Sequence, residues 1–65
     1  MIRVNGESMT HEQGLTVADL LEKRGFTFPL LVVRIDGRLV ERGAYADTRV
    51  EDGADVRVLH LLAGG

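Results

Sequence analysis

The chain has 65 residues, which is enough for one small domain with a single core. It contains no cysteine, which excludes disulfides and thiolate metal sites, and its two histidines, His11 and His60, have no metal-ligand spacing. The formal net charge is −2 and the basic residues are scattered, which argues against a nucleic-acid partner. No apolar run approaches the roughly 20 residues of a membrane span, and the first residues lack a signal peptide's apolar block. We therefore expect a cytoplasmic carrier or binding module, monomeric when free, and not an enzyme.

The first dozen residues predict a β-hairpin. Residues 2–4 alternate between apolar and polar side chains and are followed by Asn5 and Gly6. An Asn-Gly pair is a strong signal for a two-residue hairpin turn, because both turn positions need a positive φ. A second strand over residues 7–12 is expected to pair with the first.

A short helix is predicted next. Thr16 is a suitable N-cap, with Asp19 three residues later as a variant of the capping box, and Gly25 is a natural C-terminal residue. Because so short a helix is not stable alone, it must pack on a sheet. Its apolar residues at helical spacing, expected to be buried, are Val17, Leu20 and Leu21.

A second hairpin is predicted in the middle of the chain. Residues 30–35 are rich in β-branched and apolar side chains and are followed by Asp36 and Gly37, a second tight turn. Residues 38–40 would form the short return strand.

The remainder predicts a loop and a last strand. Residues 41–48 have the composition of a loop with a helical turn at 43–45, and Asp52-Gly53 marks another turn. Residues 56–62 are the most apolar stretch, which is typical of a central strand buried on much of both faces. The order of elements predicts an α+β fold, with a mixed sheet of four or five strands and one main helix across it.

The final residues suggest the chemistry. Gly64 and Gly65 follow Ala63 directly after the last predicted strand. A glycine pair is a weak signal alone and also fits a frayed end without function. After a very apolar strand, however, it suits a probe that threads a narrow channel, because glycine has no Cβ. The reactive group would then be the carboxylate of Gly65.

A carboxylate resists nucleophiles and must be activated, for example as an acyl-adenylate made from ATP. A sulfur nucleophile that displaces AMP would leave a thiocarboxylate, so a chain without cysteine could transport sulfur. The sequence has no P-loop or other glycine-rich phosphate cradle. We therefore expect no metal or cofactor on this chain, and ATP and Mg²⁺ on a partner enzyme.

The sequence resembles the ThiS-like sulfur carriers, ubiquitin-like β-grasp proteins of the ThiS/MoaD family. The resemblance extends over nearly the whole chain, although Arg34 and Arg57 stand where many members have apolar residues. The motifs that support it are Asn5-Gly6-Glu7, Gly14-Leu15-Thr16-Val17, Asp52-Gly53 and the terminal Leu62-Ala63-Gly64-Gly65.

The resemblance implies a β-grasp domain over residues 1–62 with a flexible Ala-Gly-Gly tail over 63–65. It also implies that a ThiF-like activating enzyme adenylates Gly65 and that a cysteine desulfurase supplies the sulfur. A ThiG-like thiazole synthase would accept that sulfur while forming the thiazole ring of thiamine. The chain would then be a co-substrate that is consumed and regenerated, with Gly64 giving clearance in the enzyme's channel.

Two interpretations of the last strand remain open. Alternation places Val56 and Val58 on the core face and Leu59 on the other. The second face is either a docking patch for the activating enzyme or more core. The residues expected in such a patch are Leu59, Leu61, Leu62, Ala63, Val32 and Arg34.

Other functions share part of this chemistry. A MoaD-like small subunit of molybdopterin synthase would deliver sulfur to a pterin, and other carriers would serve tRNA or cysteine synthesis. A ubiquitin-like modifier would be joined through Gly65 to lysines of target proteins. An interaction module with an inert tail would tolerate deletion of the last two glycines.

Overall fold

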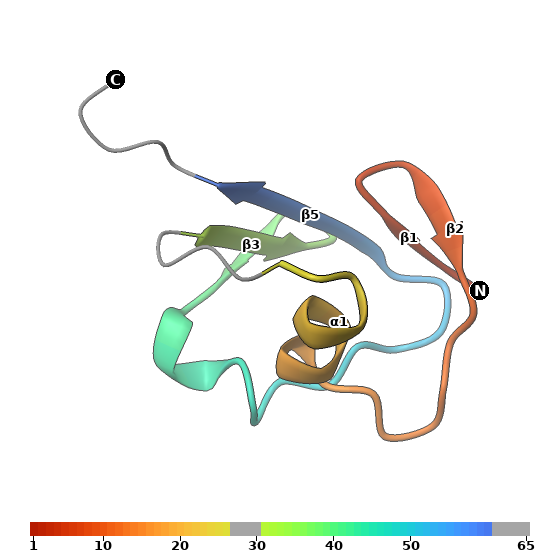
Figure 1. Ribbon diagram of the computed structural model, residues 1–65, viewed down its shortest axis with the longest axis horizontal. Helices are drawn as coiled ribbons and strands as arrows, with labels where there is room; N and C mark the ends of the chain where they lie inside the picture. The colour runs from red at the N-terminus through yellow and green to blue at the C-terminus, as the bar shows by residue number, and fades with distance from the viewer. Residues whose placement is uncertain (27–30, 61–65) are drawn as a thin grey trace.

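A computed structural model describes residues 1–26 and 31–60. The described residues form one five-stranded mixed sheet with a helix packed on one of its faces (Figure 1). This is the predicted α+β, β-grasp arrangement. The elements in chain order are β1 (Ile2–Val4), β2 (Glu7–Met9), α1 (Val17–Lys23), β3 (Leu31–Ile35), β4 (Arg38–Val40), the 3₁₀ turn η1 (Arg42–Ala44) and β5 (Asp55–His60).

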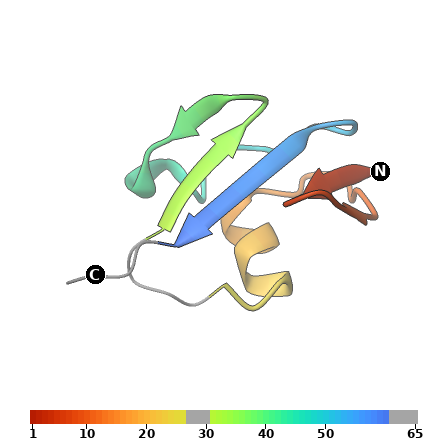
Figure 2. The same ribbon diagram turned by 90° about the horizontal axis from the view of Figure 1, so that it is seen from above.

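Strand β5 is the centre of the sheet, whose order is β2-β1-β5-β3-β4. It runs parallel to β1 and antiparallel to β3, so both hairpins are joined through it. Figure 2 shows β5 and β3 side by side, with α1 beneath them. The predicted central position of this strand is confirmed.

Both predicted hairpin turns have the backbone that their sequences require. Asn5 and Gly6 have φ of 53° and 85°, and Asp36 and Gly37 have φ of 50° and 84°. Positive φ at both central positions is typical of type I′ turns, whose twist matches that of the flanking strands. The hairpin predictions are therefore confirmed at both places.

Strand β2 is shorter than predicted, since it ends at Met9 and not at residue 12. Its only neighbour in the sheet is β1, which has three residues, and the register ends where Met9 pairs with Ile2. Among the described residues, no strand continues alongside β2 beyond that point. His11, which follows β2, is half-buried, with its Nε2 2.7 Å from the Val50 carbonyl oxygen.

The helix begins and ends as predicted. Thr16 accepts a hydrogen bond from the Asp19 amide, and the Asp19 carboxylate accepts one from the Thr16 amide, which completes a capping box. At the other end, Gly25 has φ of 72° and its amide donates to the Glu22 carbonyl, while the Phe26 amide donates to Leu21. These two bonds form a Schellman motif.

The core lies between α1 and one face of the sheet. Strands β1, β3 and β5 each contribute alternate side chains to it, and α1 adds its apolar face. No helix among the described residues is long and apolar enough to cross a membrane. The buried residues are Ile2, Val4, Leu15, Val17, Leu20, Leu21, Val33, Val50, Ala54, Val56 and Val58.

Candidate functional site

The side chains of β5 point alternately to the core and to the outer face of the sheet. By the outer face we mean the face that is turned away from α1. Val56 and Val58 are 0% and 5% exposed and belong to the core. Leu59 is 58% exposed, and Arg57 is exposed as well. The prediction that this strand is buried on both faces is therefore wrong for its described part. The expected alternation is confirmed, because Val56 and Val58 face the core and Leu59 faces away from it.

The predicted docking residues on β3 and β5 lie together. Val32 pairs with Leu59 in the antiparallel register, so the two side chains are neighbours on the outer face. Val32 is half-buried, and Arg34 on the same face is exposed. The core interpretation is therefore wrong for Leu59, and its docking role stays a prediction. We call Val32 and Leu59 the apolar pair.

Charged side chains lie next to the apolar pair on the outer face. Arg34 on β3 stands directly opposite Arg57 on β5. The Nε of Arg57 lies 3.5 Å from a carboxylate oxygen of Asp55. Leu39 on β4, which is 62% exposed, pairs with Arg34 and extends the outer face to the sheet edge. Sequence analysis noted both arginines but did not predict that they face each other, since that depends on the β3–β5 register.

Hydrogen bonds from Asn5 fix the backbone of β5 at Val58, a few residues before the expected tail. The Asn5 side chain donates to the Val58 carbonyl at 3.1 Å and accepts from the Val58 amide at 2.8 Å. These bonds continue the β1–β5 pairing past the end of β1, where the Asn5 amide already donates to Val56. Leu59 therefore follows a residue whose backbone amide and carbonyl are both bonded to the Asn5 side chain. The remaining predicted site residues, Leu61, Leu62, Ala63, Gly64 and Gly65, lie outside the described residues.

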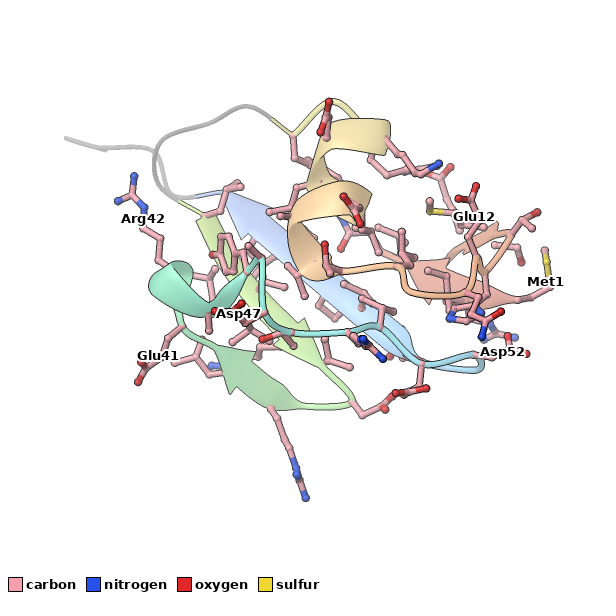
Figure 3. All side chains as sticks on the ribbon, turned by 90° about the horizontal axis from the view of Figure 1, so that it is seen from below. Met1, Glu12, Glu41, Arg42, Asp47 and Asp52 are labelled. Carbon is pink, nitrogen blue, oxygen red and sulfur yellow. The ribbon has the colours of Figure 1, made fainter. Side chains whose placement is uncertain are left out.

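Asp52 and Asp55 are close together in the sequence, but each carboxylate has its own partner. Asp52 binds the N-terminal ammonium of Met1 (Figure 3). The hydrogen bond from that ammonium, and then its charge, hold the pKa of Asp52 below its ordinary value of 3.8. Asp55 is paired with Arg57. Each carboxylate therefore has a local structural role, and they do not act as a pair.

An open groove of about 790 Å³ lies beside β4. It is lined by β4 together with Ile35, Ala44 and Arg49 among others. The described residues that were predicted for the site, Val32, Arg34 and Leu59, do not line it.

Comparison with known proteins identifies the family of this chain. The model of the ThiS family matches residues 2–65. This chain belongs to the ThiS family. The predicted family resemblance is thereby confirmed, and with it the β-grasp fold.

Solved structures and a curated relative add detail to the ThiS assignment. The crystal structure of the thiamine biosynthesis protein ThiS from Geobacter metallireducens is 31% identical, with a TM-score of 0.80 over 98% of this chain and 97% of that one. A solution structure of a thiamine biosynthesis protein from the same organism is 30% identical, with a TM-score of 0.69 over 98% and 86%. A thiazole synthase from Magnetococcus marinus is 31% identical over 64 residues, 98% of this chain. This chain spans only 20% of the length of that synthase.

Proposed function

We propose that this chain carries sulfur for thiazole formation in thiamine biosynthesis, with the carboxyl group of Gly65 as the reactive site. The observation that supports this most strongly is the ThiS-family match over residues 2–65, which includes both terminal glycines. The likeness to a thiamine biosynthesis protein and to a thiazole synthase points to the same pathway.

The proposed chemistry has three steps on the chain. A ThiF-like enzyme, which binds ATP and Mg²⁺, joins the Gly65 carboxylate to AMP and releases pyrophosphate. The outer sulfur of a persulfide, which a cysteine desulfurase forms, then attacks the activated carbon, and a C–S bond forms as the C–O bond to AMP breaks. A thiol finally cleaves the S–S bond of this acyl persulfide, which leaves the thiocarboxylate on the chain and a disulfide between the thiol and the persulfide carrier. A ThiG-like thiazole synthase accepts this sulfur, and the chain returns with its carboxylate.

The outer face would dock the activating enzyme. The apolar pair offers exposed apolar area at the end of β5 from which residues 61–65 continue. Such area beside a reactive tail suits a protein partner, because burying it supplies binding energy that does not depend on the tail. The core behind it, together with the Asn5 bonds, would keep the patch fixed during docking.

Intact-protein mass spectrometry tests the proposal. The chain is purified from cells that also express a ThiF-like enzyme and a cysteine desulfurase. We expect part of the sample to gain the mass difference of one oxygen replaced by sulfur. A variant without Gly65 is the control, and it should show no such gain.

The other functions are separated by further outcomes. Conjugates of higher mass that depend on Gly65 would identify a protein modifier. Sulfur loading followed by transfer to a pterin, and not to a thiazole synthase, would identify a MoaD-like carrier. Absence of loading with every activating enzyme tried would contradict the carrier proposal and favour an interaction module.

A further inference from the structure

The outer face places two arginines against each other at the centre of the sheet. Arg34 and Arg57 are directly opposite in the β3–β5 register, and both are exposed. Like charges directly opposite on a sheet face are destabilising. Among the described residues, Arg57 has a carboxylate partner in Asp55, whereas no ion pair is formed by Arg34.

The surrounding face is basic although the chain is acidic. Arg3 on β1 stands beside Asp55 in the parallel register and is exposed, so the charged residues of the described strands β1, β3 and β5 on this face are three arginines and one aspartate. The whole chain has a formal net charge of −2. The negative charge is therefore located elsewhere, and the outer face has the opposite sign.

The arginines stand one step along the strands from the apolar pair. Same-face neighbours on a strand are two residues apart, about 6.6 Å. The arginines lie one same-face position farther from the tail than the apolar pair. A protein interface of ordinary size, about 800 Å² on each partner, that covers Leu59 and Val32 therefore also covers Arg57 and Arg34. Bringing two opposed guanidinium groups into an interface without anions would be costly, whereas carboxylates can bind each of them in bidentate geometry.

We propose that Arg34 and Arg57 are specificity residues that bind carboxylates on the activating enzyme, beside an apolar hollow that receives the apolar pair. This inference rests on the proposed function, since it specifies the surface of the enzyme that adenylates Gly65. A second copy of this chain does not fit, because face-to-face docking would set arginines against arginines. A nucleic acid fits poorly because the chain as a whole is negative.

The test compares two double charge reversals with the same change in net charge. R34E/R57E alters the arginine pair, and R38E/R49E alters two exposed arginines that line the groove beside β4. Isothermal titration calorimetry with the organism's own ThiF-like enzyme, without ATP, gives Kd between 50 and 500 mM NaCl. ATP–pyrophosphate exchange gives kcat and KM for the same variants. Urea unfolding verifies that each variant is folded.

We expect R34E/R57E to raise Kd and KM at least about 10-fold and to flatten the salt dependence. R38E/R49E should change both by less than about 3-fold, and kcat should be retained by both variants. Equal effects of the two reversals, or no effect of either, would overturn the inference. Binding of a fluorescein-labelled single-stranded DNA that R34E/R57E abolishes would also overturn it, because the arginines would then bind phosphates.

The two proposals fail in different ways. If the wild-type chain binds the enzyme through the arginines but supports no exchange, the adenylation of Gly65 is wrong and the docking inference stands. If exchange proceeds with equal KM in every variant, adenylation stands and the arginine inference is wrong. If the wild-type chain neither binds nor supports exchange, both are wrong.

Discussion

At the residue scale, Asn5 performs two structural functions that have different origins. Its φ of 53° belongs to the hairpin turn, and the sequence predicts it because an Asn-Gly pair is a local signal. Its side chain also bonds both backbone groups of Val58, which is 53 positions away. That second function depends on the parallel β1–β5 register, so no local pattern predicts it.

Replacing Asn5 separates the two functions. N5A removes both side-chain bonds and puts alanine, which tolerates positive φ less well than asparagine, in the turn, and we expect it to lower the free energy of unfolding by about 2–3 kcal/mol. N5G removes the same bonds but tolerates the turn, so its loss should be about 1–2 kcal/mol. Urea unfolding at neutral pH measures both. Equal losses would mean that the backbone conformation contributes nothing.

Asp52 makes stability depend on pH. Its pKa is lowered in the folded state by the Met1 ammonium, so the ion pair stabilises the fold above the ordinary pKa of 3.8. This contribution is lost as the pH falls through the lower, folded-state pKa, where Asp52 becomes neutral. D52N should therefore have a lower urea midpoint than wild type at pH 7 and the same midpoint near pH 2.

The matched control for that comparison is D47N. Asp47 is exposed and forms no ion pair among the described residues. Its replacement should leave the urea midpoint close to that of wild type at both pH values. A D52N difference that persists unchanged at pH 2 would show that the loss comes from something other than the charge of Asp52.

At the element scale, predictions from the sequence were accurate where the signal is local. The caps of α1 and both hairpin turns depend on residues within five positions of one another, and all are present. Strand lengths and covered faces depend on distant neighbours. Strand β2 ends early because β1 is short, and the outer face of β5 is open because α1 covers only the other side. Neither the early end of β2 nor the open face of β5 can be predicted from the residues of that strand alone.

The capping box of α1 can be tested by a pair of threonine variants. T16A removes the hydroxyl that accepts from Asp19, and it should lower the free energy of unfolding by about 1 kcal/mol. T10A is the control, because Thr10 is exposed and precedes the helix, and its effect should stay within about 0.5 kcal/mol. Thermal and urea unfolding both report the difference. Equal effects would show that the cap is not what stabilises this helix.

At the scale of the whole molecule, one layer of sheet and one helix give a fold with a single core and a free outer face. Hydropathy alone could not separate these surfaces, because Val58 and Leu59 are adjacent and both apolar. Their environments are opposite, at 5% and 58% exposed. Strand alternation predicted that Leu59 faces away from Val58, whereas the exposure of that second face came only from the structure.

Substitution of these two neighbours distinguishes the core from the proposed docking face. V58A creates a cavity in the core and should lower the free energy of unfolding by about 2 kcal/mol, with little change in KM for the activating enzyme. L59S should cost less than about 1 kcal/mol, because Leu59 is largely exposed, but it should raise KM by removing part of the apolar pair. Urea unfolding and ATP–pyrophosphate exchange on the same two proteins give the four values. If L59S unfolds as readily as V58A, the outer face is stabilising the fold and is not free for a partner. If L59S is stable and adenylated with unchanged KM, the enzyme docks elsewhere.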